Sequence, residues 1–184
     1  MLIGITGTDG AGKGAVVNYL TKEKHFTHYS SRKLILEHIR ANNLPTTRNQ
    51  MRLTANQLRK KYGNAFVIEQ SYKKAEKDGA VNVVIESLRA VAEGEYLKNN
   101  GGVLIAVDAA VNVRYKRVQN RRSESDAVTF TEFNEHEELE KNDPNPHGMQ
   151  KAKVIEMAEY TITNNGTLEE LYLQIENVLQ KIQM

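Results

Sequence analysis

Short apolar runs recur along the chain, and each is followed by a turn and then by a helical pattern. Leu2–Thr6, Val81–Ile85 and Val103–Val107 are short and rich in β-branched residues, as expected of buried strands. Weaker strand patterns lie at Phe26–Tyr29 and Tyr160–Thr163. Strands that alternate with helices along a chain pair in parallel. The pattern therefore predicts an α/β layered fold around a parallel sheet.

The alternation is interrupted between Ser30 and Lys77. This stretch holds three successive helical patterns, over Ser31–Asn42, Thr46–Tyr62 and Ala65–Lys77, so we expect a helical insertion beside the sheet. The other helices are expected at Ala15–Lys24, Val91–Lys98, Val111–Arg122, Thr131–Lys141, Gln150–Glu159 and Leu168–Ile182. The length of 184 residues indicates a single domain.

The composition narrows the class of protein. Hydrophobic residues make up 40% and charged residues 26%, which excludes a disordered chain. The absence of cysteine excludes disulfides, cysteine nucleophiles and cysteine-bound zinc. All apolar runs are shorter than the ~18 residues of a membrane span. We expect a cytoplasmic protein that does not enter a membrane.

The net charge of +2 hides an uneven distribution. Residues 1–80 hold 14 Lys and Arg against 6 Asp and Glu, whereas residues 81–184 hold 11 against 17. A basic half suits a polyanion such as a nucleotide or, with weaker support, nucleic acid. Solvated helix faces would produce the same imbalance, so charge alone does not decide.

A glycine-rich motif directly follows the first strand. Residues 7–13 fit the pattern G-x-x-x-x-G-K and lead into a helix. Glycines let backbone amides curl toward one anion, the helix N-terminus adds positive charge, and Lys13 supplies a cation for the β- and γ-phosphates. The hydroxyl that usually follows the lysine and helps to hold Mg²⁺ is missing. We expect ATP to be bound by Gly7, Thr8, Asp9, Gly10, Ala11, Gly12, Lys13, Gly14 and Ala15.

Charged residues also follow the other two strong strands. Glu86 stands at the end of the second, with Arg89 three residues on, and Asp108 stands at the end of the third. Ligands of parallel sheets bind beyond the carboxyl ends of the strands. We therefore expect Gly7, Glu86 and Asp108 to lie along one rim.

Several arginines and one acidic run complete the candidate chemistry. Arg114, Arg117 and Arg121 share one helical face, where they could neutralise phosphate charge. In the helical insertion, Arg32 and Arg59 are the stronger candidates for binding an acceptor phosphate. Arg48 and Arg52 are weaker candidates. For the acidic run at Glu135, Glu137, Glu138 and Glu140, a solvated helix face is favoured over a metal site.

These motifs together resemble the P-loop kinases of the adenylate kinase group over nearly the whole chain. Gly12-Lys13-Gly14 is how the loop reads in adenylate kinases, where a threonine normally stands at the position of Ala15. Residues 85–89 are similar to the Asp-Gly-x-x-Arg motif of nucleoside monophosphate kinases, with Glu86 in place of the aspartate. Residues 158–164 resemble the segment that borders the adenine base. The resemblance implies a five-stranded parallel sheet of order 2-3-1-4-5.

The resemblance also implies roles and a division of the chain. Glu86 would hold Mg²⁺ through water, with Asp9 as a second metal candidate. Arg32, Arg59 and Arg89 would bind the acceptor. The catalytic set would be Lys13, Arg89, Arg117 and Arg121. The core would comprise residues 1–29, 79–122 and 149–184, with acceptor-binding helices at 30–78 and a lid at 123–148.

The sequence thus predicts an ATP- and Mg²⁺-dependent kinase that acts on a small nucleotide acceptor, most simply a nucleoside monophosphate. A dephospho-coenzyme A kinase is the alternative within the class, and its hydroxyl acceptor would make Asp9 the candidate base. A nucleotide-binding switch without a small acceptor would account for Ala15 and Glu86. A nucleic-acid-binding module is less favoured, because aromatic residues are sparse around the arginine stripe. The sequence leaves the acceptor base and the oligomeric state open.

Overall fold

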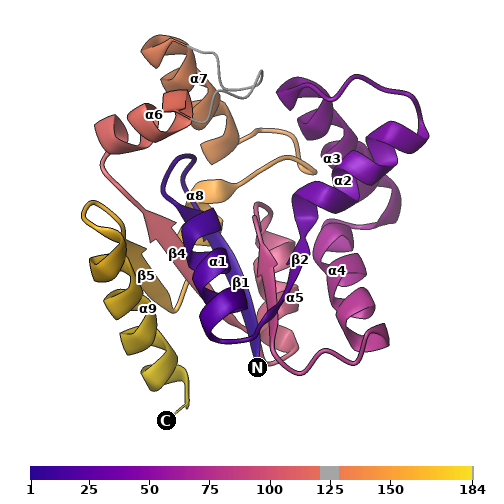
Figure 1. The fold of residues 1–184 in the computed structure, drawn as a ribbon. Coiled ribbons are helices and arrows are strands. Elements are labelled where there is room, and N and C mark those ends of the chain that lie inside the picture. Colours follow the sequence, from indigo (N-terminus) through magenta and orange to yellow (C-terminus); the bar gives the residue numbers. More distant parts are fainter. Residues whose placement is uncertain (121–128, 184) are drawn as a thin grey trace.

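The computed structural model describes residues 1–120 and 129–183, and its ribbon is shown in Figure 1. Five strands form one parallel sheet in the order β2-β3-β1-β4-β5, which confirms the expected fold and strand order. The strands are β1 (Leu2–Gly7), β2 (Thr27–Ser30), β3 (Val83–Glu86), β4 (Val103–Asp108) and β5 (Tyr160–Thr163). The helices are α1 (Lys13–Glu23), α2 (Ser31–Ala41), α3 (Arg48–Tyr62), α4 (Phe66–Lys77), α5 (Val91–Asn99), α6 (Val111–Asn120), α7 (Phe130–Lys141), α8 (Lys151–Glu156) and α9 (Leu168–Gln183).

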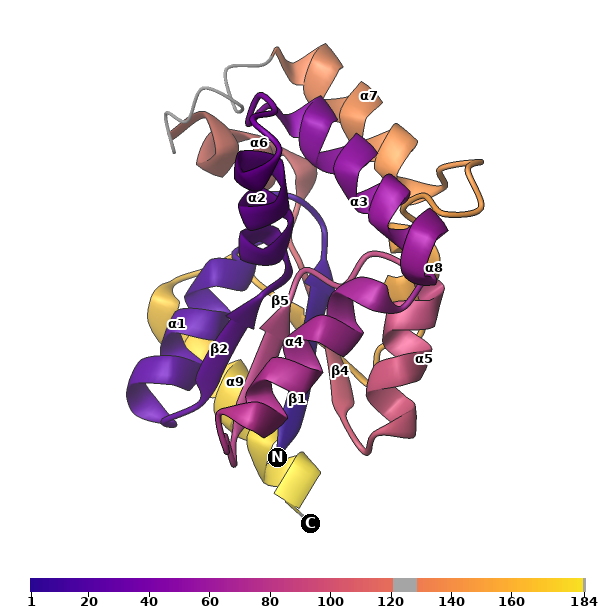
Figure 2. The same cartoon turned by 90° about the vertical axis from the view of Figure 1, so that its right-hand side faces the viewer.

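Helices cover both faces of the sheet. On one face, α1 and α9 pack against the strands in a cluster that includes Ile5, Val17 and Ile175. On the other face, α4, α5 and α8 form a second cluster that includes Ile68 and Leu97 (Figures 1 and 2). The central strands β1 and β4 are buried almost throughout. Their unbroken apolar sequences follow from this burial on both faces.

The predicted bounds differ from the observed ones mainly at element ends. Helix α1 begins two residues earlier than predicted, at Lys13, because Gly12 takes a left-handed conformation and serves as its N-cap. Strand β3 begins two residues later, because Val81 is 81% exposed and precedes the sheet. Helix α8 is shorter than predicted, since the backbone amide of Glu159 already donates to the carbonyl of Leu104 in β4, and the amide of Leu104 donates to the Glu159 carboxylate.

The carboxyl ends of β1, β3 and β4 meet at one edge of the sheet, as the sequence predicted. In the strand register, Ile5 lies beside Glu86 and Gly7 lies beside Val107. Just beyond β1, the hydroxyl of Thr8 donates to the carboxylate of Asp108 at 2.5 Å. The glycine-rich loop and the acidic ends of its neighbouring strands therefore line one rim.

Two helical groups rise beyond this rim, α2 with α3 on one side and α6 with α7 on the other (Figure 1). Helices α2 and α3 share a small apolar cluster of Ile35, Ile39 and Ala55, with Met51 against it. Helix α4, which the expected boundary 30–78 groups with them, contacts both of these helices and also packs on the sheet. Within the described ranges, no helix is long and apolar enough to cross a bilayer.

Candidate active site at the carboxyl edge of the sheet

The glycine-rich loop closes tightly around the ammonium group of Lys13. The Lys13 Nζ donates to the carbonyl oxygens of Gly7 at 3.0 Å and Thr8 at 2.7 Å. Gly10 and Gly12 have φ angles of 80° and 99°, a region that side chains rarely adopt. Burial lowers the pKa of Lys13 to about 8. The loop thus has the curled backbone and inward-facing lysine that a phosphate site requires.

Three side chains from outside the loop hold its backbone in place. Arg114 donates to the carbonyl of Asp9 at 3.2 Å. Arg117 donates to the carbonyl of Asn164 at 2.9 Å and to that of Ala11 at 3.4 Å. The side-chain amide of Asn164 donates to the same Ala11 carbonyl at 2.8 Å. The arginine face of α6 therefore reaches the loop, as its position after β4 predicted, and here it contacts the loop backbone.

Asp9 is surrounded by cations from four segments. Its carboxylate pairs with Arg48, and it lies 3.3 Å from the Nζ of Lys151, 3.7 Å from Arg89 and 3.9 Å from the Nζ of Lys13. Burial alone would raise the pKa of Asp9, but these cations hold it well below its ordinary value. An Mg²⁺ ion at Asp9 would have to displace one of these cations, so the arrangement does not favour Asp9 as a metal ligand.

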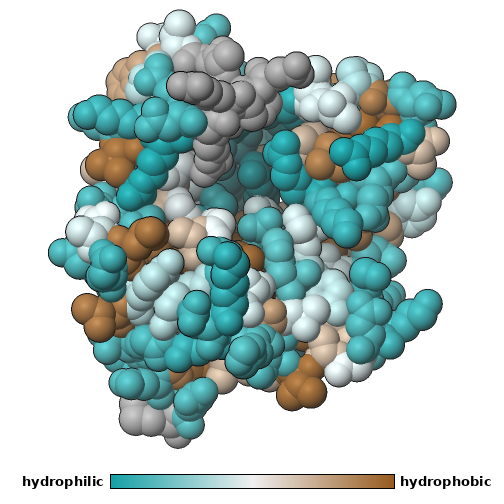
Figure 3. All heavy atoms as spheres, in the orientation of Figure 1, coloured by the Kyte–Doolittle hydropathy of each residue, from teal (hydrophilic) through white to brown (hydrophobic). Residues whose placement is uncertain are grey.

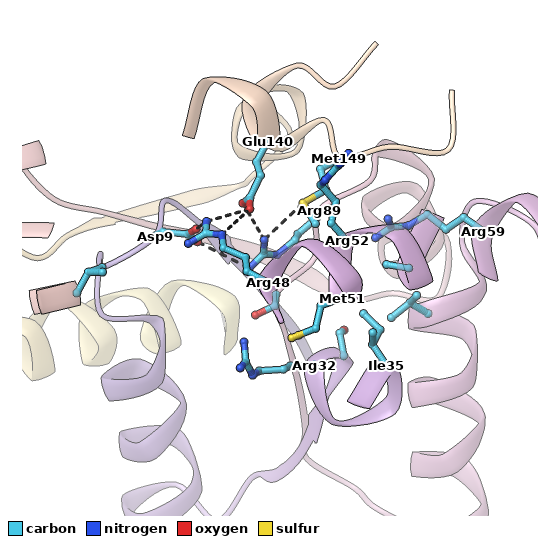
Figure 4. Close-up of a pocket in the computed structure, with 15 residues that line it drawn as sticks. Asp9, Arg32, Ile35, Arg48, Met51, Arg52, Arg59, Arg89, Glu140 and Met149 are labelled. Carbon is cyan, nitrogen blue, oxygen red and sulfur yellow. Dashed lines mark hydrogen bonds and ion pairs between the residues drawn. The ribbon is translucent and has the colours of Figure 1, made fainter. Parts of the chain in front are cut away.

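Glu140 of α7 provides a second buried carboxylate in the same cluster. It accepts hydrogen bonds from Arg48 and Arg89, each at 2.9 Å (Figure 4), and from Lys151 at 2.7 Å. Its residue is only 3% exposed. The expectation of a solvated acidic face is therefore wrong for Glu140, and Glu137 also turns inward to pair with Arg114. Each faces an arginine that the fold brings to the rim.

A cavity of about 130 Å³ opens beside this cluster, between the loop and helices α2 and α3. Its walls combine arginines with apolar side chains such as Ile35, Met51 and Met149 (Figure 4). In the view of Figure 3 the surrounding surface is largely hydrophilic and is hollowed between the two helical groups. Arg32 lines this cavity and has no hydrogen-bond or ion-pair partner among the described residues. It is thus available to an anionic ligand.

Arg59 also lines the cavity, but its guanidinium is already engaged. It binds the carboxylate of Glu93 through Nε at 3.1 Å and Nη2 at 2.8 Å, and both side chains are 2% exposed. The other oxygen of Glu93 accepts from the backbone amides of Arg89 at 2.7 Å and Ala90 at 3.0 Å. In this arrangement Arg59 supports the segment that carries Arg89. Its predicted contact with an acceptor would require this pair to open.

Glu86 lies on the rim where the resemblance expects a metal-holding acid. Its carboxylate accepts from Ser30 at 3.2 Å and lies 3.5 Å from the Nε2 of His28. Burial alone would raise the pKa of Glu86, but His28, Ser30 and Lys13 lower it, so the group is ionised at neutral pH. In the described part of the chain, no three His, Asp or Glu side chains converge to hold a metal. A single ionised carboxylate on the rim is a donor that suits Mg²⁺, which keeps most of its ligands as water and phosphate oxygens.

The turn after β3 brings Glu86 and Arg89 to the same side. Ser87 between them has a φ of 68°, which is uncommon for a residue other than glycine, and its amide donates to the carbonyl of Ile5 at 2.8 Å. Such conformations concentrate at functional sites. The predicted residue Arg121 lies outside the described residues, as does part of the predicted lid.

Sequence reasoning missed three residues of this site. Lys151 and Glu140 sit in helices with several similar side chains, and no pattern distinguishes the buried ones. Glu93 carried no capping-box signal either, because the N-cap residue Ala90 has no side-chain acceptor. Only the structure shows that its carboxylate accepts the backbone amides of Arg89 and Ala90.

Comparison with known proteins supports this picture of the fold. Residues 3–143 match the family described as AAA domain. The chain belongs to the AAA domain family. This AAA domain chain is 27% identical over 184 residues to a UPF0200 protein of Methanococcus maripaludis, which covers 98% of the chain and 97% of the relative. It is 28% identical over 186 residues to a UPF0200 protein of Methanocaldococcus jannaschii, covering 99% and 90%.

Solved structures of small kinases share the fold of this AAA domain. Shikimate kinase from Bacteroides thetaiotaomicron is 14% identical with a TM-score of 0.62, covering 100% of this chain and 99% of that one. Shikimate kinase from Acinetobacter baumannii, solved in complex with shikimate, is 20% identical with a TM-score of 0.57, covering 99% and 92%. The fold is therefore that of the small P-loop kinases.

Proposed function

We propose that this protein is an ATP-dependent phosphotransferase whose acceptor is a small phosphorylated molecule, most simply a nucleoside monophosphate. The observation that carries the proposal is the arginine-lined cavity directly beside the glycine-rich loop. The loop is built for the phosphates of a donor, and the cavity offers cations and an apolar wall for an acceptor. Phosphoryl transfer needs these two sites side by side.

The donor side is formed by residues 7–15. Lys13 and the amides of Gly10, Gly12 and Gly14 would surround the phosphates of ATP, and the N-terminus of α1 adds favourable charge. Glu86 would hold Mg²⁺ through water, and the ion would neutralise phosphate charge when bound. The hydroxyl that Ala15 lacks would be replaced by a water molecule in this arrangement.

The acceptor side lies between the loop and the helices α2 and α3. Arg32, which is uncommitted, and Arg89 would bind the acceptor phosphate, since a guanidinium donates two parallel hydrogen bonds to an oxyanion. Ile35 and Met51 offer a surface for an uncharged base. We keep residues 30–78 as the acceptor-binding region and 123–148 as a lid that excludes water.

The arginines of α6 complete the proposed machinery. Arg117 already touches the loop backbone and would stabilise the donor end, and Arg121, which lies outside the described residues, keeps its predicted role. The positive charge they add would stabilise the phosphoryl group in transit.

A hydroxyl acceptor, as in dephospho-coenzyme A kinase or in the shikimate kinases that share the fold, is the second candidate. It would need a general base, and the candidate is Asp9, which belongs to the glycine-rich loop and also lines the cavity. The cations around Asp9 lower its pKa and so weaken it as a base. This favours an acceptor that supplies its own anionic oxygen.

The proposal is tested by ADP formation from Mg·ATP with a panel of nucleoside monophosphates and dephospho-coenzyme A. We expect one monophosphate to accelerate ADP formation. Arg32→Met should raise the KM for that acceptor by about tenfold or more, because a charge-assisted hydrogen bond is lost. Lys33→Met on the same helix is the matched control, since Lys33 does not line the cavity. ATP binding without acceleration by any acceptor would support the nucleotide-switch alternative instead.

A further inference from the structure

Glu140 lies at the point where three distant segments deliver cations. Arg48 comes from the start of α3, Arg89 from the segment after β3, and Lys151 from the start of α8. All three donate to its two carboxylate oxygens; Figure 4 shows the two arginines, and Lys151 makes the shortest contact, at 2.7 Å. The side chain of Glu140 is 4% exposed and that of Lys151 is 5% exposed.

The three cations around Glu140 are better suited to binding a phosphate group than a carboxylate. Two guanidinium groups and an ammonium group converging on one oxyanion form a typical phosphate-binding arrangement. The four cations Lys13, Arg48, Arg89 and Lys151 pair with the carboxylates of Asp9 and Glu140, and Glu86 near Lys13 adds a third negative charge. Among the described residues the cluster therefore keeps one positive charge in surplus. Buried charge without a counterpart is costly, so the cluster favours a more strongly charged anion.

We propose that the Glu140 carboxylate holds the place of a substrate phosphate group, which replaces it on Arg48, Arg89 and Lys151 during binding. The ligand class is a phosphate monoester, and in this respect the inference rests on the proposed function. It assigns Lys151 to the phosphate site, and it gives Arg48 a role beyond that of a weak candidate. A phosphate monoester carries close to two negative charges at neutral pH, so the exchange balances the cluster better than Glu140 does.

The exchange would also move α7. Glu140 shares this helix with Glu137, which pairs with Arg114, and Glu140 itself lines the cavity. Once phosphate occupies the cations, Glu140 loses its partners and repels the ligand. The contacts that tie the C-terminal end of α7 to α3, to α8 and to the segment after β3 are then lost, and this end of the helix is free to reposition around the substrate.

The first test is calorimetric titration of the full chain with inorganic phosphate at constant ionic strength. Glu140→Gln removes the competing charge, and we expect phosphate affinity to rise about tenfold or more. Glu138→Gln is the matched control on the same helix, because the Glu138 side chain is 71% exposed and pairs only with Lys141. It should bind phosphate as the wild type does. Equal or weaker phosphate binding by Glu140→Gln would overturn the proposal.

A second measurement needs no variant and guards against misfolding of Glu140→Gln. Hydrogen exchange of the wild type is followed with and without saturating phosphate. The amides of α7 should exchange faster with phosphate, whereas those of α9, on the far face of the sheet, should not change. Unchanged or slower hydrogen exchange in α7 would show that Glu140 stays in place. It would overturn the proposal that phosphate replaces Glu140.

The two proposals fail separately. If ATP is turned over with an acceptor but Glu140→Gln binds phosphate no better, the replacement of Glu140 by phosphate is wrong and the proposed function stands. If phosphate displaces Glu140 but no acceptor receives phosphoryl from ATP, the replacement stands and the proposed function is wrong.

Discussion

The buried pair between Arg59 and Glu93 separates a structural role from a role in acceptor binding. Arg59→Met removes the cation and keeps much of the apolar volume. The Glu93 carboxylate then stays 2% exposed without its charged partner. It still accepts two backbone amides, from Arg89 and Ala90. These two bonds moderate the loss, because part of the hydrogen-bonding capacity of the carboxylate is still used.

The magnitude follows from this geometry. Removing one partner of a buried ion pair lowers the free energy of unfolding by about 3–5 kcal/mol. Because Glu93 keeps its two amide hydrogen bonds, we expect Arg59→Met to lie at the lower end, at ~3 kcal/mol. For a domain of this size each kcal/mol lowers Tm by roughly 2–4 °C, so the expected decrease is about 6–12 °C. Glu93→Gln should cost a similar amount. The double variant should cost less than the sum, because neither charge is then left alone.

The assay is urea unfolding followed by circular dichroism, with thermal unfolding as a second reading. Lys73→Met is the matched control, since the Lys73 side chain is 61% exposed in its 3.8 Å pair with Glu69. It should change the free energy of unfolding by less than about 0.5 kcal/mol. A loss below about 1 kcal/mol for Arg59→Met, together with a raised KM for the acceptor, would refute the structural role. It would restore Arg59 as an acceptor ligand.

Three further predictions follow from the loop and its charges. Gly12→Ala should abolish binding of a fluorescent ATP analogue, because the added Cβ would lie 2.2 Å from the Nδ2 of Asn164 at a φ of 99°. Adding Asn164→Ala should restore binding only in part, and full binding by the single variant would contradict the tight loop. Burial lowers the pKa of Lys13 to about 8, so ATP binding above pH 8 should take up a proton as phosphate restores the charge. Calorimetry in two buffers of different ionisation enthalpy measures this uptake, and the same uptake in Lys13→Met would exclude Lys13 as its source. Burial would raise the pKa of Asp9 and Glu140, but the neighbouring cations lower both pKa values. These two ionised carboxylates therefore stabilise the folded protein above roughly pH 4, and this contribution is lost as the pH falls below it. Glu140→Gln should flatten this acid decrease in the free energy of unfolding, and an unchanged slope would contradict the ion cluster.

The fold could be predicted from sequence because its signals are local. β-Branched runs mark the buried strands, and the glycine-rich loop needs only neighbouring residues to define it. Glu86 and Asp108 were placed at the rim because parallel strands end at one edge. These inferences rest on one strand or one turn at a time.

The ion cluster could not be predicted in the same way, because its members come from distant segments. Arg48 and Glu140 are 92 residues apart, and nothing near Glu140 distinguishes it from the exposed Glu138. The partner of Arg59 was equally out of reach. Its place in an arginine- and lysine-rich stretch indicated phosphate binding, and only the structure shows that Glu93 of α5 pairs with it.

The central claim is that the glycine-rich loop delivers phosphoryl from ATP to an acceptor in the adjacent cavity. The most direct measurement is transfer of label from γ-³²P ATP to a nucleoside monophosphate, with products separated by chromatography. The wild type should form labelled nucleoside diphosphate, whereas Lys13→Ala should fold normally and form none. Label released only as inorganic phosphate, or equal transfer by Lys13→Ala, would contradict this account of the site.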